Sequence, residues 1–266
     1  MAGANLTGLL AFLSGRAPVG FCVAFSGGVD SALLLAACAG TGGRVLAVTL
    51  HSPLHAPGEP GEAAALAHSL GVEHRLLTLP EIPPAILNNP PDRCYLCKKE
   101  LFGRILTLAQ AEGPGVVVDG TNADDLGVYR PGRKALAELG VLSPLAALGF
   151  SKAQVREMAG ELGLTVAGKP SAPCLATRFP YGAPLTPEGM AKAERMESAV
   201  KALGIPVARA RIHGETVRIE IPPDDFGKLV AARGELAALC RSLGFFYLAM
   251  DLEGFRSGSM DVGIGE

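Results

Sequence analysis

The segment Phe25–Ser31, with the sequence FSGGVDS, constrains the fold of this chain more than any other stretch. It follows an apolar, strand-like run at Val19–Phe25 and leads into an apolar helical run at Ala32–Ala39. A turn between a strand and a helix gathers free backbone N–H groups and the positive helix end, which favours binding of a phosphate. Gly27 and Gly28 allow positive φ and close approach of an anion. The order therefore predicts a phosphate-binding loop.

The polar side chains of this loop fit the same function. Ser26 and Ser31 add hydroxyl donors, and Asp30 lies where a carboxylate could hold Mg²⁺ between phosphates. The loop lacks Gly-Lys-Ser/Thr, so it is not a Walker A loop. A serine-capped glycine turn without a ligand is the alternative for an isolated SGG, but the full SGGVDS in this setting favours a nucleotide.

The next part of the chain alternates between strand and helix patterns. Strand-like runs at Val45–Leu50, His74–Leu79 and Val116–Asp119 are separated by helical runs at Glu62–Leu70 and Tyr95–Ala111. This alternation predicts an α/β fold with a doubly wound parallel sheet. Ligands of such sheets bind at the carboxyl ends of the strands, where the phosphate loop falls.

A second polar segment, DGTNADD at Asp119–Asp125, also follows a predicted strand. Its Gly120, Thr121, Asn122 and Asp125 should therefore converge on the crevice that holds the phosphate loop. An ordinary turn before an acidic helix start is the alternative. Together with the first motif, we interpret these residues as part of a nucleotide site.

The C-terminal part predicts a smaller α+β domain. Ser151 is a candidate N-cap for a helix through Leu162. The long loop Gly168–Pro187 contains the domain boundary, giving one domain at 1–168 and a second domain at 169–266. The elements expected beyond the loop are a helix at Pro187–Leu203, strands at Ala208–His213 and Thr216–Ile221, a helical segment at Asp224–Leu243 and a strand at Phe245–Leu252.

The composition indicates which classes of partner the protein is expected to bind. The chain has 24 basic and 26 acidic residues, so its net charge of −2 does not favour a nucleic-acid partner. No apolar run is long enough to span a membrane, and the start lacks the basic region of a signal peptide. We therefore expect a cytoplasmic protein with no membrane partner.

The six cysteines fall into two groups. Cys22, Cys38 and Cys240 lie in apolar runs and are expected to be small buried hydrophobes. Cys94 and Cys97 form a CxxC at a predicted loop-to-helix junction, where a helix N-terminus lowers thiol pKa values.

Cys174 lies in a loop rich in Pro, Arg and Ser. Three thiolates are one short of a closed structural zinc site. On a 4Fe-4S cluster, three protein ligands would leave one iron open for sulfide or substrate. The CxxC alone also fits redox or zinc chemistry, so only its combination with the phosphate loop favours sulfur chemistry.

Arg209 and Arg211 stand two apart on a predicted strand, so both should point to one face. Two guanidinium groups on one face suit a phosphate monoester. An exposed basic face on an edge strand is the alternative.

Several of these segments together resemble one family. The chain is similar to the LarE family, ATP-dependent sulfur transferases of the PP-loop ATP pyrophosphatase superfamily that make the nickel-pincer nucleotide cofactor. The likeness covers most of the chain, through SGGVDS, DRCYLCK, DGTNADDLGVYRPG, KPSAPCLATRFPYG, ARARIHGETVRIEI and GFRSGSM. In that family the residue matching Cys174 carries the sulfur. Members with only that cysteine sacrifice its sulfur, whereas members that also have the CxxC assemble a 4Fe-4S cluster.

The resemblance also implies roles for the two domains and for single residues. Residues 1–168 would form the PP-loop ATP pyrophosphatase domain, and residues 169–266 the substrate-binding, sulfur-transfer domain. Arg209 and Arg211 match arginines that hold the substrate phosphate, and Arg256 lies in another matched segment. Glu197 and Glu220 match acidic residues linked to metal or substrate handling. The family further implies a homo-oligomer, a trimer or hexamer, and sulfide or another sulfur donor.

The implied reaction is adenylation of a carboxylate of pyridinium-3,5-biscarboxylic acid mononucleotide, with ATP and Mg²⁺, followed by sulfur insertion. The main alternative is a tRNA thiolase of the three-cysteine PP-loop type. An amide-forming relative of the NAD and GMP synthetases would not need the three cysteines. A nucleotide sensor with a zinc clip would bind ATP without turnover.

Overall fold

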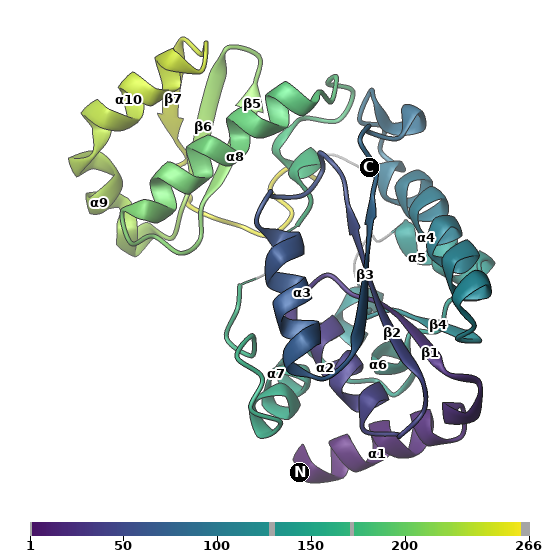
Figure 1. Cartoon of the computed structure of the whole chain (residues 1–266). Helices are drawn as coiled ribbons and strands as arrows, with labels where there is room; N and C mark the ends of the chain where they lie inside the picture. The colour runs from purple at the N-terminus through teal and green to yellow at the C-terminus, as the bar shows by residue number, and fades with distance from the viewer. Residues whose placement is uncertain (1, 128–130, 171–172, 262–266) are drawn as a thin grey trace. The chain divides into compact units, whose positions relative to one another are not determined.

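The computed structural model describes residues 2–127, 131–170 and 173–261 in two compact units, labelled by element in Figure 1. Residues 128–130 and 171–172, which belong to two of the motifs quoted above, lie outside the described ranges. The first unit comprises Met1–Ser52, Pro57–Leu79 and Asp92–Ser171, and the second comprises Pro53–Ala56, Pro80–Pro91 and Ala172–Glu266. Nothing in the sequence indicated that the two short upstream segments belong to the second unit.

A four-stranded parallel sheet forms the centre of the first unit. The strands are β1 (Phe21–Ala24), β2 (Val45–His51), β3 (Glu73–Thr78) and β4 (Val116–Val118), in the order β3-β2-β1-β4. The chain winds outward from β1 to β3 and then returns to the other side of β1. The predicted doubly wound sheet is thus confirmed, with its switch point between β1 and β4, where such folds bind ligands.

Alternate strand residues pack on opposite faces of this sheet. Phe21 and Val23 join a core with residues of α1 (Ala2–Ser14), α2 (Val29–Ala39), α3 (Glu59–Ser69), α6 (Pro144–Ala147) and α7 (Lys152–Glu161). Cys22 joins a second core with residues of α4 (Arg93–Glu112) and α5 (Gly132–Glu138). Helices therefore cover both faces, which explains why these strands read as continuous apolar runs.

Three helices were not predicted from the sequence: α1, α5 and α6. Helix α1 has two glycines and no acidic residue in its first turn, so its local helix signals are weak. Its Leu9 and Leu13 are fully buried, and tertiary packing stabilises the helix. By contrast, the predicted N-cap Ser151 is confirmed, because its hydroxyl accepts from the backbone N–H of Gln154 in a capping box.

The second unit contains a three-stranded sheet of β5 (Arg209–His213), β6 (Thr216–Glu220) and β7 (Tyr247–Met250), in that order. Strand β5 is antiparallel to β6, and β7 is parallel to it. The helices of this unit are α8 (Pro187–Ala202), α9 (Phe226–Ala231) and α10 (Arg233–Ser242).

The segment predicted to be helical at Asp224–Leu243 is helical, but it is divided into α9 and α10 at Ala232. Leu229 on α9 and Leu236 on α10 are both buried. None of the helices in the described ranges is long and apolar enough to cross a membrane.

Candidate active site

The phosphate loop runs from the end of β1 into α2. Gly27 has φ of 71°, and a Cβ added there would lie 3.3 Å from the backbone of Ala63, so the position favours glycine. The Ser31 hydroxyl donates to the Gly28 carbonyl at 3.0 Å and lies 3.2 Å from the Ser26 hydroxyl. The loop is therefore a compact turn with its two hydroxyl groups side by side.

The loop after β4 lies against the phosphate loop. A Cβ added to Gly120 would be 2.9 Å from the backbone nitrogen of Ser31, so only glycine permits this approach. Asn122 donates from Nδ2 to Oδ1 of Asp30 at 3.0 Å. Asp125 caps the turn, because its Oδ2 accepts from the Asn122 backbone N–H at 3.2 Å.

Asp119, at the end of β4, is a buried carboxylate with several donors. It accepts from the hydroxyl of Thr121 at 2.5 Å and from that of Ser143 at 2.5 Å. The ammonium of Lys98 on α4 lies 3.8 Å from it. The predicted site residue Thr121 thus fixes Asp119, which in turn faces a lysine near the CxxC.

The sequence reasoning missed Lys152. This first residue of α7 pairs its ammonium with Oδ2 of Asp30, and its backbone N–H donates to Asp124 at 2.9 Å. The carboxylate of Asp30 is thus held between an amide and a cation, with 22% of its side chain exposed. One signal could have found Lys152: a phosphate loop without its own lysine needs a cation from another segment.

The thiols of the predicted cluster set lie in both units. Cys94 and Cys97 stand one turn apart at the start of α4, and Cys174 directly precedes the 3₁₀ helix η4 (Leu175–Arg178) of the second unit. All three are half-buried. Within the described ranges, no three His, Cys, Asp or Glu side chains are grouped so that they could hold a metal ion.

The other cysteines are buried hydrophobes, as predicted. Cys22 and Cys38 are fully buried, and Cys240 is 1% exposed. Burial raises the pKa of the Cys22 and Cys38 thiols to about 12, so both stay protonated and unreactive near neutral pH.

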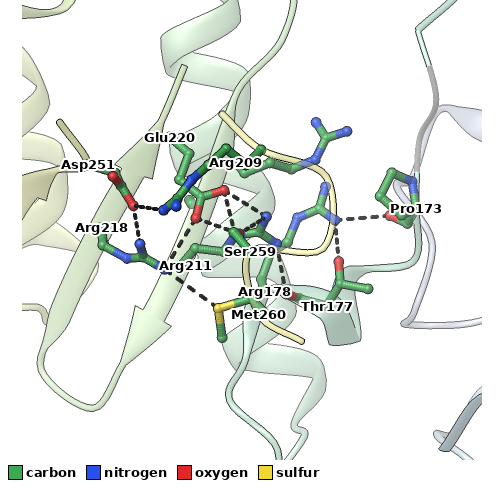
Figure 2. A network of polar contacts seen from close by, with 12 residues as sticks. Pro173, Thr177, Arg178, Arg209, Arg211, Arg218, Glu220, Asp251, Ser259 and Met260 are labelled. Atoms are coloured by element: carbon green, nitrogen blue, oxygen red, sulfur yellow. Dashed lines mark hydrogen bonds and ion pairs between the residues drawn. The ribbon is translucent and has the colours of Figure 1, made fainter. Parts of the chain in front are cut away.

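Arg209 and Arg211 lie on one face of the second sheet, but they are not an exposed basic surface. Only 6% and 5% of their surface is exposed. Arg211 donates to Glu220 at 2.7 and 3.0 Å, to the Ser259 hydroxyl at 2.9 Å and to the Thr177 carbonyl at 2.9 Å (Figure 2). Helix η4 contacts this face through Thr177, and the segment after β7 contacts it through Phe255 and Ser259, which explains the burial.

Arg209 has a different environment from Arg211. Its guanidinium stacks over the ring of Phe255 at 5.1 Å. Burial, followed by repulsion from Arg178, lowers the pKa of Arg209 to about 10. Arg209 is therefore still charged near neutral pH, and a bound anion would stabilise its charged form.

The remaining predicted residues take part in ion pairs. Glu197 pairs with Arg178 at 2.6 Å, and Glu220, which is fully buried, also lies 3.2 Å from Arg218. Arg256 is partly exposed and lies 3.4 Å from Asp251. The sequence reasoning missed Arg178, Arg218 and Asp251, because these pairs join separate segments.

The parallel sheet and the SGGVDS loop at the end of β1 define the class of fold, an α/β fold of the PP-loop type. The structure of NMN synthetase from Francisella tularensis has this fold, with a TM-score of 0.52 and 19% identity over 65% of this chain and 76% of that one.

Sequence comparison identifies the family. No family model matches. Pyridinium-3,5-bisthiocarboxylic acid mononucleotide synthase of Lactiplantibacillus plantarum is 39% identical over 242 residues, 90% of this chain and 88% of that protein. An uncharacterized protein of Synechocystis sp. is 40% identical over 90% of this chain and 91% of its own length. The chain therefore belongs to the LarE family of sulfur-transferring enzymes.

A tRNA-specific 2-thiouridylase of Trichlorobacter lovleyi is more distant, with 30% identity over 55% of this chain and 51% of that protein. The match leaves about half of each chain unpaired. A match over only about half of each chain is more consistent with a common PP-loop unit than with a common substrate.

Proposed function

We propose that the protein adenylates a carboxylate of pyridinium-3,5-biscarboxylic acid mononucleotide and replaces the adenylate with sulfur. A carboxylate oxygen attacks the α-phosphorus of ATP, and pyrophosphate leaves. A sulfur nucleophile then attacks the acyl carbon, and AMP leaves to give the thiocarboxylate. The Lactiplantibacillus relative is a pyridinium-3,5-bisthiocarboxylic acid mononucleotide synthase, which supports this substrate class. Sulfide or another donor, a homo-oligomer and a cytoplasmic location belong to the same proposal.

The observation that carries the proposal is a direct contact between the Cys174 turn and the arginine pair. Arg211 donates to the carbonyl of Thr177, three residues after Cys174. Arg209 stands two residues away on the same face of β5. A phosphate held by these arginines would bring its mononucleotide to the sulfur-carrying residue.

The first unit supplies the groups for adenylation. The backbone N–H groups at the start of α2 and the hydroxyls of Ser26 and Ser31 are suited to pyrophosphate. Lys152 supplies positive charge for the phosphates, and Asp30 supplies a carboxylate of the kind that Mg²⁺ binds. Such preorganised charges stabilise the transition state of phosphoryl chemistry.

The three half-buried thiols suit a 4Fe-4S cluster in their donor chemistry, because iron–sulfur clusters are held by cysteine thiolates. Cys94, Cys97 and Cys174 would hold it. When bound through three thiolates, a cluster leaves one iron available for an extra sulfide. The helix start at Cys94 favours the thiolate form that such ligation requires.

Anaerobic reconstitution tests the proposal. Protein supplied with iron and sulfide should contain both, absorb as a 4Fe-4S protein, and form AMP, pyrophosphate and thiocarboxylate over several turnovers per chain. Replacing Cys94, Cys97 or Cys174 by Ala should remove the chromophore and the sulfur transfer together. The matched control is Cys38→Ala, which changes a buried cysteine outside the set.

Two results would contradict parts of the proposal. A single turnover with Cys174 lighter by one H₂S, together with an active Cys94→Ala variant, would replace the cluster by sacrifice of the cysteine sulfur. Formation of thiolated tRNA with a steep salt dependence of binding, and no reaction with the mononucleotide, would overturn the substrate class.

A further inference from the structure

Arg178 joins both sides of the turn that carries Cys174. Its Nη1 donates to the Pro173 carbonyl at 3.1 Å and to the Thr177 hydroxyl at 2.7 Å, as Figure 2 shows, and lies 3.4 Å from the Cys174 carbonyl. Arg178 itself is 3% exposed. One buried side chain therefore contacts the residue before Cys174, Cys174 itself and the third residue after it.

The backbone around Cys174 is also fixed by other bonds. The Cys174 carbonyl accepts from the Thr177 N–H at 3.1 Å and from the Thr177 hydroxyl at 2.9 Å. The Leu175 N–H donates to the Leu54 carbonyl at 2.8 Å. The turn is thus bonded on both sides of the cysteine, while the thiol stays half-buried.

Glu197 holds Arg178 in this position. Its two oxygens accept from Nε at 2.6 Å and from Nη2 at 2.9 Å of Arg178, the bidentate geometry that fixes a guanidinium plane. Oε1 also accepts from the Ala210 N–H of β5 at 3.0 Å. Both oxygens of this 3%-exposed carboxylate are engaged by the protein.

We propose that Arg178 is the positioning residue for the sulfur of Cys174, and that Glu197 acts through Arg178 rather than as a ligand of a metal or the substrate. The inference rests on the proposed function for the role of Cys174. The second step requires the sulfur to reach the acyl carbon before water does, and such a step depends on placement of the turn. Adenylation does not depend on the placement of this turn, because it uses groups of the first unit.

Two variants separate this role from general stability. Arg178→Lys keeps a cation for Glu197, but one ammonium group does not span the carboxylate and the Pro173 carbonyl together. The double variant Arg178→Met with Glu197→Leu removes the pair while leaving no unpaired buried charge, a replacement that proteins often tolerate. The matched control is Arg233→Met, because this exposed arginine also bonds a backbone carbonyl of the second unit.

The measurement is the ratio of thiocarboxylate formed to pyrophosphate released, together with the alkylation rate of Cys174 by iodoacetamide in protein that has not been reconstituted with iron and sulfide. We expect both test variants to release pyrophosphate but to form thiocarboxylate about 10²-fold less per pyrophosphate, the usual cost of a small misplacement. Cys174 should be alkylated about tenfold faster, because the turn opens more often. The Arg233→Met control should match the wild type in both measurements.

The two proposals fail in different ways. If either folded variant keeps the wild-type ratio and the wild-type alkylation rate, Arg178 does not position Cys174. If the wild type releases no pyrophosphate with the mononucleotide, the proposed function fails. The alkylation rates then still decide whether Arg178 holds the turn.

Discussion

Arg211 and Arg218 stand directly opposite each other in the antiparallel pairing of β5 and β6. Like charges at such a position repel and would destabilise the sheet. Glu220, on the same face of β6, resolves this: one carboxylate oxygen lies 2.7 Å from Arg211 and the other 3.2 Å from Arg218. The fully buried Glu220 therefore bridges two arginines that the fold places together, and Asp251, which also pairs with Arg218, supplies a second negative charge.

The first prediction concerns this carboxylate. Glu220→Gln should lower the free energy of unfolding by about 3 kcal/mol, since breaking a buried ion pair leaves uncompensated charge. Urea unfolding, followed by circular dichroism, measures the change. The control Glu215→Gln alters an exposed residue of the same hairpin and should have little effect. Equal stability of the two variants would show that Arg211 and Arg218 do not depend on Glu220.

The second prediction separates Arg209 from Arg211. Arg211 is already bonded to Glu220, Ser259 and Thr177, so Arg211→Met should chiefly destabilise the second unit. Arg209 donates to the Ala208 carbonyl, and burial and repulsion from Arg178 lower its pKa more than Glu197 and Glu220 raise it, so a bound anion would relieve that repulsion. Arg209→Met should weaken binding of the mononucleotide by about 1.5–3 kcal/mol, the scale of a charged hydrogen bond.

Calorimetric titration with the mononucleotide and with ATP checks this difference. ATP affinity should change little in Arg209→Met, because the groups proposed to bind ATP lie in the first unit. An equal loss of both ligands would instead point to general unfolding of the second unit. An Arg211→Met variant with wild-type stability would contradict the assignment of its hydrogen bonds.

The sequence was sufficient where the signals are local. The strand, glycine turn and helix around Ser26, the alternation of strands and helices, and the N-cap Ser151 all depend on neighbouring residues, and the structure contains each of them. Lys152 was missed because its pairing with Asp30 joins residues far apart in the chain. The burial of Arg209 was missed because irregular segments cover it, and a strand pattern does not reveal such a cover.

The third prediction concerns the carboxylate of the phosphate loop and its lysine. Asp30→Ala should abolish formation of AMP and pyrophosphate, while the fold stays intact. Lys152→Met should weaken ATP binding by about 1.5–3 kcal/mol, the loss of a charged hydrogen bond. Pyrophosphate release and ATP titration measure these effects, and the exposed Lys201→Met is the control. Pyrophosphate release near the wild-type rate in Asp30→Ala would exclude Asp30 from the metal site.

The last prediction concerns His74 on β3, which contacts Thr49, a residue hydrogen-bonded to Phe25 at the start of the phosphate loop. The Thr49 hydroxyl donates to the Phe25 carbonyl at 2.7 Å, so His74, whose Nε2 lies 2.8 Å from the same oxygen, must be the donor. Burial lowers the pKa of His74. Protonation of His74 therefore leaves this hydrogen bond in place. The free-energy cost of protonation comes from placing a charge on a partly buried ring.

The sign of the pH effect follows from linkage. Below about pH 6.5 the unfolded chain binds a proton at this position more readily than the folded protein does, so folding stability falls as the pH falls. Burial and the nearby Arg218 also lower the pKa of His213, which adds an effect of the same sign. His74→Gln should reduce, but not abolish, the loss of unfolding free energy between about pH 7.5 and pH 5.5. The control His68→Gln, on the exposed side of α3, should retain the wild-type slope, and an identical slope in His74→Gln would show that His74 does not contribute.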